Sequence, residues 1–102
     1  MKIEFRHSFG KEEALARLQA LTGYWDHKHG IRSDWDGSTA RIKGKVKGVS
    51  FEGTLEVLPD QLTADMKVGF LAEKLGGRAY VERKLGEYLD PKNTLEDLKA
   101  RG

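Results

Sequence analysis

The 102-residue chain contains no cysteine, only two prolines and no long apolar run. The absence of cysteine excludes disulfide bonds, thiolate nucleophiles and thiolate metal ligands, and it is typical of a reducing compartment. No stretch approaches the roughly 20 apolar residues of a membrane-spanning helix. The first residues, MKIEFRHS, alternate polar and apolar side chains and lack the apolar core of a signal peptide. We therefore expect a cytoplasmic protein without a transmembrane segment.

A strong net charge is also missing. The chain has 18 basic and 16 acidic residues, which gives a net charge of +2. This small excess creates no field that would attract nucleic acid. Hydrophobic residues make up 38% of the chain and charged residues 33%, which is typical of a small globular domain rather than of a disordered chain.

The hydrophobic pattern predicts the element order β-α-β-β-β-β-α, followed by a tail. Residues 2–7 alternate with a period of two, and residues 11–29 carry an apolar helical stripe. Four strands follow over residues 31–35, 38–47, 49–58 and 61–70, joined by turns at Asp36-Gly37, Lys47-Gly48 and Pro59-Asp60. A second helix covers residues 71–89. We expect one α+β domain over residues 1–90 and a polar C-terminal tail over residues 91–102, which forms a short, frayed helix.

Pairs of facing residues follow if each turn has a two-residue loop. The expected pairs are Trp35–Ser38, Ser33–Ala40 and Ile31–Ile42 in the first hairpin, Ile42–Gly53, Gly44–Phe51 and Val46–Val49 in the second, and Leu55–Ala64, Gly53–Met66, Phe51–Val68 and Val49–Phe70 in the third. In all three hairpins the apolar residues then share one face, whereas a slip of one residue would turn a strand inside out. Gly44 and Gly53 lie in mid-strand on that face, which marks a bend or the close approach of another element. We expect a curved antiparallel sheet with the helices packed on one face.

The opposite face carries the stretch RIKGKVKG, residues 41–48, with a basic side chain at every second position. The register places Glu52 between Lys43 and Lys67, and opposite charges across strands are common on solvated sheet faces. No aromatic side chain is interleaved with the basic residues, as a nucleic-acid binding face would require. We interpret this face as a solvated surface and expect no nucleic-acid partner.

Residue types that catalyse reactions or bind metals form no recognisable constellation. His27 and His29 are two residues apart, whereas a helical zinc pair needs a spacing of four. In the alternation of the first strand, His7 falls on the same face as the apolar residues. We favour a structural, hydrogen-bonded histidine over a catalytic base at this position. No serine has an identifiable base and orienting acid. We expect no catalytic residue, no metal, no cofactor and no enzymatic activity.

Four short strings occur in a recognisable order and spacing. They are HSFG before the first helix, GIRSDW after it, GVSFEGTLEV in the middle of the sheet and VGFLAEKLGG at the start of the last helix. Over roughly residues 5–89 the chain resembles the polyhydroxyalkanoic acid system family, a group of short bacterial proteins associated with polyester-granule genes. The resemblance implies a bacterial cytoplasmic protein of polyhydroxyalkanoate storage without catalytic activity. It supplies no catalytic residue for this chain.

Two functional hypotheses remain open. In the first, the protein is a binding or interaction module at the polyhydroxyalkanoate granule or with granule proteins, and a helix presents apolar residues to the partner. The candidate partner face consists of Leu75, Val81, Leu85 and Leu89. The ordinary core of a two-layer domain is the favoured interpretation of the same residues.

In the second hypothesis, the protein is a small helix-grip-like carrier of an apolar ligand beneath the curved sheet. The candidate cavity residues are Ala40, Gly44, Gly53, Ala64, Met66 and Trp35. A cavity of roughly several hundred Å³ beneath Gly53 favours the carrier. An exposed apolar patch above roughly 400 Å² favours the interaction module. A homodimer is compatible with either hypothesis.

Overall fold

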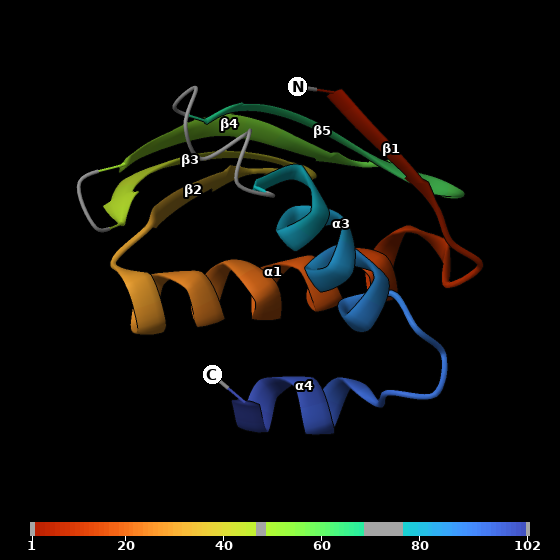
Figure 1. The fold of residues 1–102 in the computed structure, drawn as a ribbon. Coiled ribbons are helices and arrows are strands. Elements are labelled where there is room, and N and C mark those ends of the chain that lie inside the picture. Colours follow the sequence, from red (N-terminus) through yellow and green to blue (C-terminus); the bar gives the residue numbers. More distant parts are fainter. Residues whose placement is uncertain (1, 47–48, 69–76, 102) are drawn as a thin grey trace.

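A five-stranded antiparallel sheet forms one layer of the computed structural model, which describes residues 2–46, 49–68 and 77–101 (Figure 1). The strands are β1 (Lys2–Arg6), β2 (Arg32–Asp36), β3 (Thr39–Val46), β4 (Val49–Val57) and β5 (Gln61–Val68). The helices are α1 (Gly10–His29), α3 (Gly77–Tyr88) and α4 (Leu95–Arg101). Helices α1 and α3 lie on the same face of the sheet, and α4 lies beyond α1 (Figure 1). The predicted α+β fold, element order and one-sided helix packing are confirmed.

Helix α1 presents an apolar stripe to the sheet. Four residues at helical spacing are at most 2% exposed, namely Ala14, Leu18, Leu21 and Trp25. Gly30 ends the helix in the left-handed conformation, with φ of 66°, and its N–H donates to the carbonyl of Asp26. Neither α1 nor any other helix within the three described ranges is long and apolar enough to cross a membrane.

The strands lie in the order β1-β5-β4-β3-β2. The second and third hairpins have the predicted registers, with Gly53 opposite both Ile42 and Met66. The predicted pair of Val49 and Phe70 lies outside the described residues, because it involves Phe70. The N-terminal strand β1 pairs with β5 at one edge of the sheet, and β2 forms the other edge.

The first hairpin differs from the predicted register. The expectation that Trp35 faces Ser38 is wrong, because Trp35 lies opposite Ala40, and the other two pairs of this hairpin shift with it. The loop consists of Gly37 and Ser38, and Gly37 has φ of 61°. Glycine takes this positive φ without strain at the first loop position, so the turn forms one residue later than expected. The pairing shifts by two residues, which keeps every side chain on its predicted face.

Two glycines let other parts of the chain approach the sheet closely. A Cβ atom at Gly44 would lie 2.8 Å from Cα of Ile31. A Cβ atom at Gly53 would lie 2.6 Å from the carbonyl oxygen of Asp65 and 2.7 Å from Sδ of Met66. A side chain therefore does not fit at either position without displacing its neighbours. The predicted close approach is confirmed, and the sheet curves over the helices (Figure 1).

A buried arginine joins α1 to the end of α3. Arg17 is 3% exposed, and its Nη1 donates to the carbonyl oxygens of Tyr88 at 3.0 Å and Asp90 at 3.3 Å. Its Nε donates to Glu13 Oε2 at 3.0 Å, and its guanidinium carbon lies 3.9 Å from the centroid of the Phe9 ring. The last carbonyls of a helix lack partners within the helix. The guanidinium therefore caps α3 and fixes it to α1 at the same time.

Helix α4 packs against α1, so the expectation of a frayed tail is wrong. Leu98 is 0% exposed and belongs to the hydrophobic core. Asn93 Nδ2 donates to the carbonyl of Glu87 at 2.9 Å, and Arg101 pairs with the carboxylate of Glu87. A single buried leucine and these polar contacts anchor a segment whose composition is largely polar.

Candidate functional site

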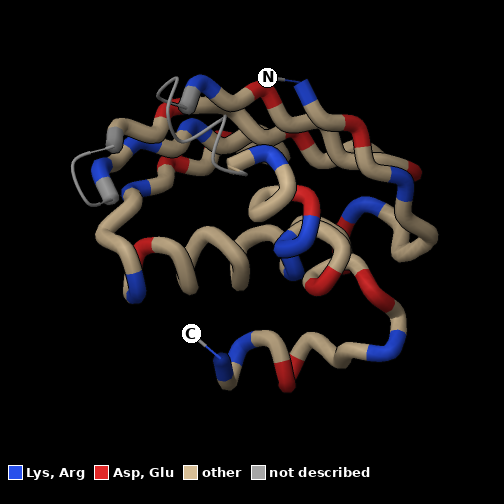
Figure 2. The backbone as a smooth tube through the Cα atoms, in the orientation of Figure 1, with Lys and Arg blue, Asp and Glu red and all other residues tan. Residues whose placement is uncertain are grey.

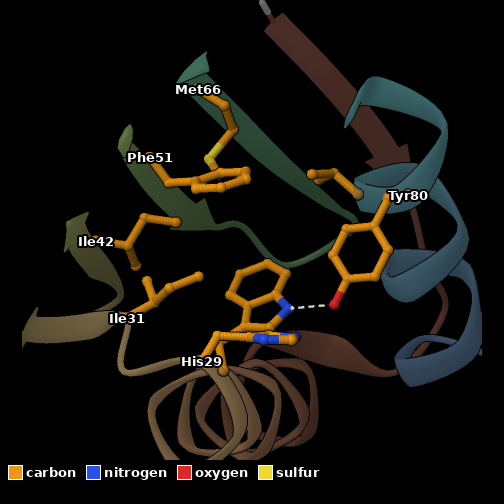
Figure 3. A pocket seen from close by; sticks show the side chains of 8 residues that line it. His29, Ile31, Ile42, Phe51, Met66 and Tyr80 are labelled. Atoms are coloured by element: carbon orange, nitrogen blue, oxygen red, sulfur yellow. Dashed lines mark hydrogen bonds between the residues drawn. The ribbon is translucent and has the colours of Figure 1, made fainter. Parts of the chain in front are cut away.

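An apolar cavity of about 220 Å³ lies between the inner face of the sheet and helices α1 and α3 (Figure 3). The described side chains that line it are Trp25 and His29 of α1, Ile31, Ile42 of β3, Phe51 of β4, Met66 of β5, and Tyr80 and Val81 of α3. Apolar cavities with a few polar groups are the usual sites of small-molecule binding. This cavity is smaller than the roughly 300–1,000 Å³ of drug-sized sites, but it is larger than a cavity of about 150 Å³ that binds benzene.

The sheet side of the cavity is built around Gly53. Ile42 and Met66 are the cross-strand neighbours of Gly53, and Phe51 lies two residues before it on β4. These three side chains point from their strands into the space between sheet and helices (Figure 3). The cavity lies next to the position of Gly53, but its volume of about 220 Å³ is below the several hundred Å³ expected for the carrier.

The lining residues whose side chains carry nitrogen or oxygen atoms lie on the helix side of the cavity. Trp25 Nε1 donates to the hydroxyl oxygen of Tyr80 at 3.3 Å, which joins α1 to α3 (dashed line in Figure 3). His29 makes an edge contact with Tyr24, with ring centroids 6.3 Å apart. The guanidinium carbon of Arg83 lies 5.5 Å from the centroid of the Tyr80 ring. Among the described lining residues, nitrogen and oxygen atoms of side chains therefore come from Trp25, His29 and Tyr80.

The structure places the two candidate cavity glycines beside the cavity rather than in its lining. Of the six candidate residues, Met66 lines the cavity. The space that a side chain would take at Gly44 is filled by Ile31, and the space at Gly53 is filled by Met66 and the backbone of β5. The missing side chains thus permit close packing instead of making room for a ligand.

The remaining three candidate residues pack in the core or at its edge. Ala40 is 0% exposed and Ala64 is 2% exposed. Trp35 is half-buried, and its Nε1 donates to Thr22 Oγ1 of α1 at 3.1 Å. These contacts hold the sheet against α1, and the three residues do not line the cavity.

The candidate partner face is buried. Val81 is 2% exposed, Leu85 0% and Leu89 4%, and Leu75 lies outside the described residues. The favoured interpretation of these residues as core is confirmed for the three that are described. They therefore present no exposed apolar surface to a partner, although Val81 forms part of the cavity wall.

His7 has two backbone hydrogen bonds. Its Nε2 donates to the carbonyl of Leu58 at 3.0 Å, and its Nδ1 accepts from the N–H of Phe9 at 3.3 Å. Both ring nitrogens are thus engaged, as expected for a structural histidine. Within the described ranges, no group of three His, Cys, Asp or Glu side chains is placed to hold a metal ion.

Residues of both charge signs are interspersed along the strands of the sheet (Figure 2). Glu52 lies between Lys43 and Lys67, as predicted. The ion pairs found among the described residues all join residues of the helices. Glu52, Lys43 and Lys67 therefore lie close in register without forming an ion pair. These charges face solvent, which agrees with the interpretation of this face as a solvated surface.

The lining residues differ in how far the sequence could identify them. The strand pattern placed Ile42 and Phe51 on the inner face near Gly53. The alternation of the strands could therefore have identified both as lining residues of the cavity. Trp25, His29 and Tyr80 were missed as lining residues. They carried no comparable signal, because the helix turn that lies over a given strand depends on tertiary packing.

Comparisons with known proteins assign the chain to a family. A family model described as "Putative polyhydroxyalkanoic acid system protein" matches residues 1–92. Searches of the curated proteins and of the solved structures returned no match. The matched range contains every described residue that lines the cavity. As its resemblance predicted, the chain belongs to the polyhydroxyalkanoic acid system protein family.

Proposed function

We propose that the protein is a non-enzymatic, cytoplasmic binding protein of the polyhydroxyalkanoate system that holds alkyl chains in the cavity between the sheet, α1 and α3. Polyhydroxyalkanoates are polyesters whose units carry alkyl side chains. The observation that carries the proposal is an apolar cavity of about 220 Å³ in a member of this family. The proposal applies the carrier hypothesis to a cavity smaller than that hypothesis expected, with the granule as the partner that supplies the alkyl chains.

The size of the cavity sets the length of chain that it can hold. On the scale of the cavity that binds benzene, about 220 Å³ corresponds to about nine heavy atoms of ligand. Each buried methylene contributes about 0.8 kcal/mol, so a filled cavity contributes about 6–7 kcal/mol. Association costs at least about 4 kcal/mol of this contribution, so we expect dissociation constants in the millimolar range.

The exposed-helix form of the interaction hypothesis has less support. Val81, Leu85 and Leu89 are occupied by core packing. We therefore propose that any contact with the granule runs through the cavity. A homodimer is compatible with this function and can be tested by light scattering.

The non-catalytic part of the proposal rests on the sequence and on His7. The sequence has no identifiable nucleophile with a base and an orienting acid. Both ring nitrogens of His7 bond to the backbone, which supports a structural role for this histidine.

Co-sedimentation with polyester particles tests the proposed function. The full chain is mixed with particles of a polyester that has medium-length alkyl side chains and, separately, with particles of one that has methyl side chains. We expect binding to the first and weak binding to the second, because a methyl group buries little surface in the cavity.

A cavity-filling variant and a matched control localise the binding. In Val81→Phe the ring occupies part of the cavity, and binding should fall by at least about tenfold, which corresponds to the loss of two buried methylenes. Leu15→Phe makes a comparable change at a half-buried residue that does not line the cavity, and it should bind like the wild type. Equal binding of both polyesters, or full binding by a folded Val81→Phe variant, would contradict the proposal.

A further inference from the structure

Aromatic rings form much of the cavity wall. Phe, Trp and Tyr make up 9% of the chain, yet three of the eight described lining residues are of these types, namely Trp25, Phe51 and Tyr80. They come from α1, β4 and α3, so the rings border the cavity from three separate elements. Figure 3 shows Phe51 on the sheet side, Tyr80 on α3, and Ile31 and Ile42 together to one side. The wall therefore combines rings on more than one side with branched aliphatic side chains.

The polar atoms of two of these side chains bond to each other. Trp25 Nε1 donates to the hydroxyl oxygen of Tyr80 at 3.3 Å, and this bond uses the single donor of the indole. The wall that a ligand can touch is almost entirely apolar. A bound molecule therefore meets the carbon atoms of rings and aliphatic side chains, and a polar group of the ligand is favoured outside the cavity, in water.

The rings are held by contacts with one another and with residues that do not line the cavity. Trp25 is 2% exposed, and its bond to Tyr80 fixes both side chains. The guanidinium carbon of Arg83 lies 5.5 Å from the centroid of the Tyr80 ring. Phe51 projects from β4, which pairs with a strand on either side. A wall that is ordered before binding loses little freedom when a ligand enters, so it can select a ligand by shape.

We infer that the cavity prefers a flat aromatic ring at the end of a short alkyl linker to an aliphatic group of the same carbon number. Contacts between aromatic rings add to the burial of their surface, and one such contact corresponds to about a two- to tenfold change in a dissociation constant. A benzene ring fits a cavity of about 150 Å³, so about 220 Å³ leaves room for a linker of about three carbons. The inference rests on the proposed function and adds the chemical class of the preferred side chain, an aryl-terminated alkyl group.

Titration of the full chain with three acids of equal carbon number tests the inference. The probes are γ-phenylbutyrate, γ-cyclohexylbutyrate and decanoate, whose carboxylate makes them soluble and remains outside the apolar wall. The amide chemical shifts of the lining residues report both the site and the dissociation constant. We expect the wild type to bind γ-phenylbutyrate about two- to tenfold more tightly than either of the other two acids.

Phe51→Leu removes one ring and keeps an apolar side chain. The dissociation constant of γ-phenylbutyrate should rise by about two- to tenfold. The constant of γ-cyclohexylbutyrate should rise less, because leucine replaces most of the apolar contact but not the contact between rings. Phe5→Leu makes the same change at a half-buried residue that does not line the cavity, and it should leave all three constants unchanged. The ranking of the three acids on the wild type tests the inference even if Phe51→Leu does not fold.

A polymer side chain and a free acid can both carry the aryl group, and co-sedimentation distinguishes these two sources. Particles of a polyester with phenylpropyl side chains should sediment more of the wild-type chain than particles with cyclohexylpropyl side chains. A preference for γ-phenylbutyrate among the free acids without this sedimentation would support the aromatic inference and contradict the granule as the source of the ligand.

The outcomes separate this inference from the proposed function. If the three acids shift the amides of the lining residues but γ-phenylbutyrate binds no more tightly than γ-cyclohexylbutyrate, the aromatic preference is wrong and the apolar site stands. Equal losses of affinity for both cyclic acids in Phe51→Leu would also overturn the inference. If no acid shifts these amides, the proposed function itself fails.

Discussion

Replacing Arg17 by methionine should destabilise the protein substantially. Arg17 is 3% exposed and donates to two carbonyl oxygens at the end of α3, those of Tyr88 and Asp90. Methionine fills similar space without donors, so the carbonyl of Tyr88 loses the guanidinium donor, whereas the carbonyl of Asp90 still accepts from the N–H of Asn93 at 3.0 Å. Because α1 and α3 both supply residues of the cavity wall, the same contact also fixes these parts of the wall relative to each other.

The magnitude follows from the individual contacts. Hydrogen bonds from a charged group contribute about 1.5–3 kcal/mol each, and the bond to Asp90, at 3.3 Å, belongs at the low end. Stacking on Phe9 adds about 0.5–1 kcal/mol, and the pair with half-exposed Glu13 adds about 0.3–0.5 kcal/mol. The variant no longer has to desolvate a guanidinium, which offsets part of the loss. We expect a net destabilisation of about 2–4 kcal/mol.

Urea unfolding followed by tryptophan fluorescence measures this loss. The slope of the free energy against urea should stay constant, so the midpoint reports stability. Glu13→Gln removes only the ion pair and should cost less than about 0.5 kcal/mol. Arg17→Lys keeps the charge but loses the planar donor geometry, so its loss of stability should lie between those of Arg17→Met and Glu13→Gln. It also provides the test if Arg17→Met does not fold. A loss for Arg17→Met as small as that for Glu13→Gln would refute the reasoning.

Three further predictions concern packing and ionisation. Gly53→Ala should lower stability by about 1–3 kcal/mol, because the new Cβ would lie 2.6 Å from the carbonyl oxygen of Asp65. As a control, Gly23→Ala at an open helix position should raise stability by up to about 1 kcal/mol, and calorimetry measures both variants. Burial raises the pKa of Tyr88 above its ordinary 10.0, so the unfolded chain loses this proton first and stability should fall as pH rises above about 10. Its hydroxyl has no partner in the described ranges, so Tyr88→Phe should remove this part of the alkaline loss and raise stability at neutral pH; an unchanged pH profile would disprove the assignment. Leu98→Ala should cost about 2–5 kcal/mol, whereas a frayed α4 would lose almost nothing in the same urea assay.

The strand registers illustrate how far local pattern carries a prediction. The registers around Gly53 follow from alternation with one buried face, because a slip of one residue would expose a whole strand. Alternation does not distinguish registers that differ by two residues. In the first hairpin the turn decides between these two registers, because Gly37 takes the positive φ at the first loop position.

The cavity shows where local pattern stops. Parity placed Ile42, Phe51 and Met66 on the inner face, yet the glycines beside them suggested open space where the structure has close packing. Whether a small residue leaves room or admits a neighbour depends on what approaches it. The bond between Trp25 and Tyr80 joins residues 55 positions apart, and no periodicity within either helix predicts it.

The sequence alone determined the order of the elements, the face on which each side chain lies and the family, because these depend on local periodicity, turn residues and ordered strings. Only the tertiary structure decided that β1 pairs with β5, that Arg17 caps α3, that α4 docks through Leu98 and that the apolar cavity borders Tyr80 and His29. Each of these features joins segments far apart in the chain. Their formation depends on the burial of several elements at once, which no single stretch of sequence specifies.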